Sequence, residues 1–216
     1  MDLSMILMKL AEGMLVSIEI FVLTLLFSLP LGLLVAFGRM SKCLLLSLPI
    51  KLYISIMRGT PLMLQLMVVY YGPYYLLGIS LPRGYRFIAV IVGFVINYAA
   101  YFSEIYRGGI ESISLGQYEA AKVLGYSRTQ TFFRIILPQV IKRILPSVTN
   151  ETITLVKDTS LAQVISVSEM FIAAKALASK EQSVVPFFAA GVFYYIFNYL
   201  VAFVMEWLEN KLAYYR

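Results

Sequence analysis

Three polar side chains that could bind a solute stand inside long apolar stretches of this sequence: Arg58, Asn97 and Asp158. A carboxylate such as that of Asp158 accepts hydrogen bonds from a cationic group, whereas guanidinium and amide groups donate them to an anionic one. Polar groups at membrane depth are costly, so such residues are candidates for function by default. Asp158 and Asn97 in particular favour a binding role.

A structural role is the alternative for residues of this kind. Polar side chains within membranes also form interhelical hydrogen bonds or ion pairs. Here Asp158 could pair with Arg58 or with Lys157. For Thr152 and Thr154 we expect this structural role.

The residues that enzymes use most often are missing from the chain. It has no histidine and one cysteine, Cys43, which excludes histidine general bases, Ser–His–Asp triads, histidine-ligated metal sites and an intrachain disulfide. We therefore predict neither catalysis nor a bound metal. The net charge of +6 comes from Lys and Arg beside apolar runs rather than from a basic stripe with aromatic residues, so nucleic-acid binding is not predicted.

The elements that must position these side chains are membrane helices. The 216 residues are 60% hydrophobic, with a mean hydropathy of +0.81, and apolar runs of about 20 residues can span a bilayer. We predict an all-α integral membrane protein with a single domain over residues 1–216. Its five transmembrane helices are expected over residues 14–37, 44–77, 87–106, 138–166 and 185–207. Pro61 should kink the second span or break it into two pieces.

Flanking charge predicts the orientation. When the loops are numbered alternately, one side carries eleven basic residues: Arg39, Lys42, Lys51, Arg107, Lys122, Arg128, Arg134, Lys142, Arg143, Lys211 and Arg216. The other side carries five: Lys9, Arg83, Arg86, Lys175 and Lys180. Cytoplasmic loops are richer in Lys and Arg, so we predict an N-terminus outside and a cytoplasmic C-terminus. Residues 167–182 are expected to form a short helix at the outer surface.

A polar, helix-prone segment at residues 114–138 interrupts the apolar majority on the cytoplasmic side. Two pairs fit capping boxes at helix N-termini: Ser114 with Gln117, and Ser127 with Gln130. Gly125 is a natural helix stop, and Pro138 is tolerated in the first turn of a following helix. We predict two short helices joined at a glycine corner.

The first of these helices has a predicted small apolar face made by Tyr118, Ala121 and Leu124. Glu119, Lys122 and Arg128 are expected to stay polar. The physical pattern leaves two interpretations open, because such a hairpin could dock another protein or only shield the helix bundle. Glu104 and Arg107 lie three residues apart, so they are predicted to pair on one helix face and to brace this segment.

The segment resembles the EAA loop of ATP-binding-cassette (ABC) importer permeases. That motif consists of EAA, three residues, Gly, nine residues, Ile, one residue and Leu-Pro. This chain has Glu119-Ala120-Ala121, Gly125, Ile135 and Leu137-Pro138 at those spacings. Three further stretches are similar to the polar-amino-acid permeases of the family: Arg58 to Leu66, Ile96 to Ile110, and Leu145 to Ser166. Tyr98 departs from the smaller residue expected beside the asparagine.

The resemblance implies the assembly and the coupling residues. It implies a multi-pass protein of the bacterial cytoplasmic membrane that works with a second permease copy, as a homodimer, and with an extracellular or periplasmic amino-acid-binding protein. A separate ATPase subunit would bind ATP and Mg, since this chain carries no G-x-x-x-x-G-K-[ST] loop and no cofactor of its own. Glu119, Ala120, Ala121 and Gly125 would couple the permease to that ATPase.

The resemblance also implies a substrate, a polar amino acid. Its carboxylate needs donors, such as Asn97, Arg58 and helix-break amides, and its ammonium group needs an acceptor, such as Asp158. The full set of candidate substrate-binding residues is Arg58, Gln65, Asn97, Tyr98, Asp158, Thr159 and Ser160. Two other functions stay open as alternatives, a polar-lined ion channel and an intramembrane enzyme that uses carboxylates.

Overall fold

The computed structural model describes residues 3–82 and 84–212, and every regular element within them is helical. The elements are α1 (Leu3–Arg39), α2 (Leu44–Gly59), α3 (Leu62–Leu77), α4 (Tyr85–Glu111), α5 (Leu115–Val123), α6 (Arg128–Thr131), the π-helical turn η1 (Phe132–Ile136), α7 (Leu137–Asp158), the 3₁₀ segment η2 (Thr159–Ile165), α8 (Met170–Glu181) and α9 (Val185–Leu212). The prediction of an all-α fold is confirmed. Two residues of the charge comparison, Arg83 and Arg216, lie outside the described residues.

Three single helices, α1, α4 and α9, are long and apolar enough to cross a membrane. Two bent pairs pass the same test: α2 with α3, where the chain bends by 113°, and the helix that ends at Ile165 with α8, where it bends by 62°. Five crossings result if each bent pair is one span. The break predicted at Pro61 is confirmed, since α2 ends at Gly59 and α3 begins at Leu62.

The long helices α1 and α4 pack closely because small residues line their contact. A Cβ added to Gly32 would lie 2.9 Å from the Cβ of Phe102 and 3.1 Å from the carbonyl oxygen of Ala99. Ala99, Ala100 and Ser103 are buried on the facing side of α4. Small side chains of this kind let membrane helices approach each other and gain van der Waals contact.

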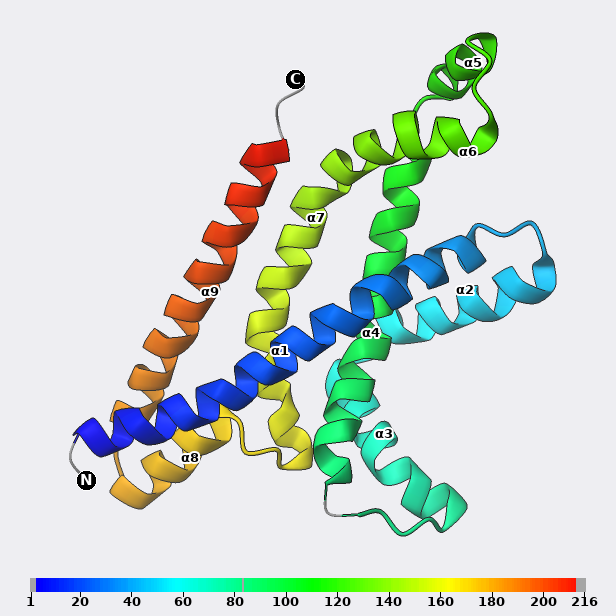
Figure 1. Cartoon of the computed structure of the whole chain (residues 1–216). Coiled ribbons are helices and arrows are strands. Elements are labelled where there is room, and N and C mark those ends of the chain that lie inside the picture. Colours follow the sequence, from blue (N-terminus) through cyan, green and yellow to red (C-terminus); the bar gives the residue numbers. More distant parts are fainter. Residues whose placement is uncertain (1–2, 83, 213–216) are drawn as a thin grey trace.

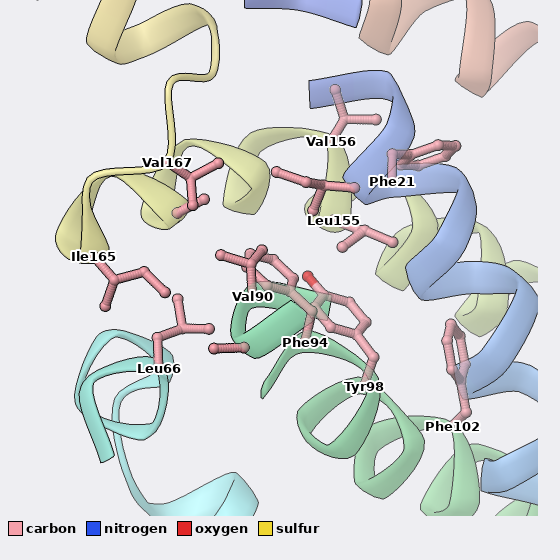
Figure 2. Packing of buried hydrophobic residues seen from close by; sticks show 13 residues of the cluster. Phe21, Leu66, Val90, Phe94, Tyr98, Phe102, Leu155, Val156, Ile165 and Val167 are labelled. Carbon is pink, nitrogen blue, oxygen red and sulfur yellow. The ribbon is translucent and has the colours of Figure 1, made fainter. Parts of the chain in front are cut away.

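The main core gathers side chains from α1, α3, α4, α7 and η2 (Figure 2). Its aromatic column runs along α4, where the Phe94 and Tyr98 rings stack at 6.3 Å, and Tyr98 and Phe102 lie 6.2 Å apart. Leu66 and Ile165 complete the core from α3 and η2. Segments far apart in the sequence therefore meet around the middle of α4.

The two ends of the molecule carry different elements (Figure 1). The short helices α5 and α6 and the C-terminal end of α9 lie toward one end, whereas α8 and the N-terminal end of α1 lie toward the other. Helix α8 was predicted as a short helix, and it packs its buried Met170, Ala174 and Leu177 against α1 and α9. The orientation of the two ends relative to the cytoplasm stays a prediction.

Candidate functional site

Two amide side chains close the break between α2 and α3. Carbonyl groups in the last turn of a helix lack intrahelical donors, and Pro61 supplies no N–H at the break. Gln65 Nε2 donates to the carbonyl oxygens of Met57 and Thr60 at 3.0 and 3.1 Å, and to Thr60 Oγ1 at 2.9 Å. Asn97 Nδ2 donates to the Met57 carbonyl at 3.2 Å and to Gln65 Oε1 at 2.9 Å.

The structure thus brings Gln65 and Asn97 together, and it engages their N–H donors within the chain. A cavity of about 300 Å³ lies beside them, and Met57, Thr60 and Gln65 are among the residues that line it. The remainder of the lining is apolar or glycine: Ile56, Leu64, Val68, Val69, Gly93 and Ile96. The break therefore lies beside a cavity, and the amide N–H donors of Gln65 and Asn97 are already used for hydrogen bonds within the chain.

Asp158, the last residue of α7, faces α4. Its Oδ2 accepts a hydrogen bond of 2.8 Å from the hydroxyl of Tyr98, which is only 2% exposed. Among the described residues, no other group donates a hydrogen bond to Asp158. The structural alternative, an ion pair of Asp158 with Arg58 or Lys157, is not formed among the described residues, since the direct partner is a neutral hydroxyl from the aromatic column of α4.

The hydroxyls around Asp158 bond to their own helix. Thr159 Oγ1 donates to the Val156 carbonyl and Ser160 Oγ to the Lys157 carbonyl, each at 2.8 Å. Thr152 and Thr154 also donate to carbonyls four residues earlier, at 2.8 and 2.9 Å. The interhelical bonds predicted for Thr152 and Thr154 are not formed, since both hydroxyls bond within α7, a common alternative for Thr in helices.

Arg58 has a long ionic contact and no hydrogen bond within the described residues. Its Nη1 lies 3.9 Å from Glu104 Oε2, and its guanidinium carbon lies 5.5 Å from the centroid of the Tyr101 ring. The side chain is 47% exposed. Since a guanidinium carries five N–H donors, Arg58 retains donors for an anionic group that arrives from outside the chain.

Glu104 connects three helices, because basic residues from α1 and α2, as well as one from its own helix α4, lie beside its carboxylate. The predicted pair with Arg107 is confirmed at 2.7 Å, and Arg39 from the end of α1 lies 3.5 Å away. Arg107 also pairs with Glu111, near the start of the polar segment. Arg39 was missed because 65 residues separate it from Glu104 and nothing local in the sequence relates the two.

Glu151 is a further acidic residue that the sequence-based prediction left out. It lies on α7 seven residues before Asp158, on the same helix face. It interacts electrostatically with both Asp158 and Arg58. The spacing of seven was the available signal. The structure therefore adds a second carboxylate on α7 to the candidate site.

The α5–α6 unit stands on a small core of its own. Ala121, 1% exposed, points inward, and Tyr118 packs against the cluster of Ile113, Ile136 and Val140. Leu124 is 73% exposed, so the face predicted to unite it with Tyr118 and Ala121 is wrong. The exposed face instead carries Leu115, Glu119, Ala120, Val123 and Leu124.

Local start and stop signals shape this unit. Ser127 and Gln130 form the predicted capping box, with bonds of 2.9 and 3.3 Å. Ser114 is the residue that precedes α5, but its side chain makes no capping hydrogen bond, so that box is wrong. Gly125 has φ of +76°, which favours glycine. Pro138 lies in the first turn of α7, and the π turn before it accommodates the missing N–H without a break.

No group of three or more His, Cys, Asp or Glu side chains within residues 3–82 and 84–212 is arranged to hold a metal ion. The polar groups that remain available to a ligand near the middle of the chain are therefore Arg58, Asp158 and Glu151. Arg58 comes from α2 and lies beside Tyr101 of α4, whereas Asp158 and Glu151 come from α7 and Asp158 bonds to Tyr98 of α4.

The sequence matches known proteins over most of its length. The family model of the binding-protein-dependent transport system inner membrane component matches residues 28–214. The arginine transport system permease protein ArtQ of Bacillus subtilis (strain 168) is 40% identical over 159 residues, which cover 73% of this chain and 71% of that protein. The putative glutamine transport system permease protein GlnP of Rickettsia bellii (strain RML369-C) is 34% identical over 202 residues, which cover 93% and 91%.

Solved structures share the same fold. A crystal structure of an amino acid ABC transporter with histidines matches with a TM-score of 0.87 and 29% identity, and the match covers 98% of this chain and 99% of that one. An inward-facing structure of the MetNI methionine ABC transporter matches with a TM-score of 0.70 at 16% identity, covering 99% and 100%. The chain therefore belongs to the family of binding-protein-dependent transport inner membrane components, as an amino-acid ABC transporter permease.

Proposed function

We propose that this chain is the transmembrane subunit of an ATP-driven importer that carries a polar amino acid across the cytoplasmic membrane. The observation that carries the proposal is the pair of incompletely hydrogen-bonded ionic groups beside α4. Arg58 has no hydrogen bond among the described residues, and Asp158 has one. An amino acid carries the two complementary groups, a carboxylate and an ammonium.

In this proposal Arg58 binds the substrate carboxylate, and Asp158 accepts hydrogen bonds from the ammonium group, with Glu151 adding negative charge nearby. Charge-assisted hydrogen bonds of this kind are about twice as strong as neutral ones. Gln65 and Asn97 hold the α2–α3 corner that presents Arg58. Thr159 and Ser160 bond to carbonyl groups of α7 and support the end of that helix, which carries Asp158, and Tyr98 bonds to Asp158 from α4.

The α5–α6 unit is proposed to bind the partner ATPase. Its exposed apolar residues Leu115, Val123 and Leu124 are 76, 87 and 73% exposed, and Glu119 and Ala120 lie on the same outer surface. Ala121 and Gly125 act indirectly, since Ala121 is buried on the inner side of α5 and Gly125 turns the chain toward α6. The unit continues into α7 through the π turn, so a movement of α5 is transmitted toward Asp158.

The proposed assembly has two permease copies, two ATPase subunits and an external amino-acid-binding protein. ATP would close the ATPase pair and move the α5–α6 units, and the helix bundle would then open outward to receive the amino acid. Hydrolysis would reset the pathway. The names of the relatives, which are arginine and glutamine permeases, support an amino acid as the cargo.

The experiment is copurification of this chain with its ATPase, followed by ATP-dependent amino-acid uptake in vesicles that also contain the binding protein. The variant Glu119→Lys should lose the ATPase or its stimulation by substrate, because it reverses a charge on the exposed face of α5. The matched control is Lys175→Glu, an exposed charge reversal on α8 outside that face, which should keep the ATPase bound. Uptake without the ATPase, or a Glu119→Lys complex with full activity, would contradict the proposal.

A further inference from the structure

Tyr98 is enclosed by the side chains that surround it. It lies in the middle of α4 and is 2% exposed. Its ring stacks on Phe94 with an interplanar angle of 7° and contacts Phe102 on the other side. Figure 2 shows the ring between these two side chains, with its oxygen directed toward the part of the core that contains Leu155. A ring packed on both sides keeps its hydroxyl in one place.

The hydroxyl of Tyr98 determines where one oxygen of Asp158 lies. It donates to Oδ2 at 2.8 Å, and no other described group donates to this carboxylate. An ionised carboxylate has about four lone-pair positions on its two oxygens. One is taken by Tyr98, and the bond leaves Oδ1 and the remaining positions on Oδ2 for a donor from outside the chain.

The alternative of pure packing does not account for this geometry. Phenylalanine would fill the same space in the aromatic column of α4, and the hydroxyl adds nothing to ring packing. Desolvation of a phenol is unfavourable unless the hydroxyl finds a partner. The partner it finds is the one carboxylate at the end of α7, whose other hydrogen-bonding positions are unfilled.

We propose that Tyr98 is a positioning residue that sets the substrate affinity of this permease: it orients the Asp158 carboxylate so that its free lone pairs face the ammonium group of the amino acid. This inference rests on the proposed role of Asp158 in substrate binding. Tyr98 does not need to touch the substrate. Its contribution is that the acceptor is already oriented before binding, so less conformational freedom is lost when the ligand arrives.

The test uses the complete transporter in vesicles, with radiolabelled L-arginine and L-glutamine as the probes. Tyr98→Phe preserves the ring and removes the hydroxyl. We expect KM for the transported probe to rise by about tenfold, which corresponds to about 1.4 kcal/mol, with the maximal rate little changed, because the carboxylate must then be ordered when the substrate binds.

The matched control is Tyr194→Phe. Tyr194, on α9, also donates to a carboxylate at 3.1 Å, but to that of Glu169 at the N-terminus of α8. Its removal should leave KM unchanged. A double-mutant cycle completes the test, since Tyr98→Phe should add nothing further to KM once Asp158→Asn is present.

The outcomes separate the two proposals. If the wild-type transporter moves neither probe and no other amino acid, the proposed function fails. If the wild type transports a probe and Tyr98→Phe has the same KM, or if its effect persists undiminished with Asp158→Asn, the positioning role of Tyr98 is overturned. A larger KM in Tyr98→Phe alone, with Tyr194→Phe unchanged, supports it.

Discussion

Two carboxylates withdrawn from the surface of this molecule have very different surroundings. Glu169, between η2 and α8, is 0% exposed. It accepts hydrogen bonds from the backbone N–H groups of Phe171 and Ile172 at 2.7 and 2.9 Å and from the Tyr194 hydroxyl at 3.1 Å. Asp158, at the end of α7, accepts a single bond, from Tyr98.

The number of hydrogen-bond donors around each carboxylate distinguishes a structural polar group from a ligand-binding one in this apolar protein. A buried carboxylate is tolerated when donors surround it. Glu169 meets this condition as the N-terminal cap of α8, and it ties that helix to α9. Asp158 does not meet it within the chain, so the missing donors are expected to come from a ligand.

The largest expected effect is on transport. Asp158→Asn should lower uptake of a zwitterionic or cationic amino acid by about tenfold or more, because it removes a charge-assisted bond worth about 1.5–3 kcal/mol. Assembly with the ATPase should persist. Glu169→Gln, which keeps an acceptor for the cap of α8, should retain uptake. Uptake rates measure both variants. Equal losses would contradict the different roles of the two carboxylates, and normal uptake by Asp158→Asn would exclude Asp158 from the substrate site.

The second prediction concerns stability, where we expect the Glu169 variant to have the larger effect and the Asp158 variant the smaller one. Glu169→Ala leaves two backbone N–H groups and the Tyr194 hydroxyl without their acceptor, so the free energy of unfolding should fall by about 3 kcal/mol or more. Asp158→Ala deletes one hydrogen bond and should cost about 1 kcal/mol. Thermal unfolding in detergent compares them, and a larger loss for Asp158→Ala would show that the bond count does not identify the structural group.

The third prediction concerns the packing that surrounds Glu169. A Cβ added to Gly13 on α1 would lie 2.8 Å from Met170 Cα. Gly13→Ala should therefore cost about 1–3 kcal/mol, since backbone must move to relieve the overlap. Gly191 on α9 has no atom within 4 Å of the added Cβ, so Gly191→Ala is the matched control. Equal melting temperatures for both variants would contradict a rigid joint around α8.

The smallest effect is expected in the exposed α5–α6 unit. Ser127→Ala removes a formed capping box and should destabilise α6 by about 0.5–2 kcal/mol. Ser114→Ala removes no capping hydrogen bond and should change little. Amide hydrogen exchange of residues 115–131 measures both, and faster exchange in Ser114→Ala than in Ser127→Ala would show that the hydrogen-bond criterion does not extend to exposed sites.

Much of this arrangement could be predicted because its causes are local. Pro61 interrupts a helix wherever the fold places it, since it lacks an N–H. Gly125 adopts its left-handed conformation for a similarly local reason, and Ser127 and Gln130 cap a helix within four residues. The predicted range 44–77 compares with α2 and α3 at Leu44–Leu77, and 185–207 with α9 at Val185–Leu212.

The predictions that the structure does not bear out depend on how separate segments pack together. The structural alternative for Asp158 was a pair with Arg58 or Lys157, but its partner is Tyr98, 60 residues away in the sequence. Leu124 was assigned to an apolar face by helical spacing alone, yet α5 ends at Val123 and leaves it exposed. Periodicity identifies a face, but it does not say which face meets the rest of the protein.

Three properties could be read from the amino-acid sequence alone. The chain is helical and apolar enough for a membrane, its helices break at identifiable residues, and its motifs indicate its family. Those properties follow from composition, backbone chemistry and the spacing of a few residues. Only the tertiary structure decided which polar groups are satisfied within the chain. Gln65 and Asn97 lie on different helices and become partners only when α3 and α4 pack. Hydrogen bonds form over about 3 Å, and only folding brings such distant residues that close.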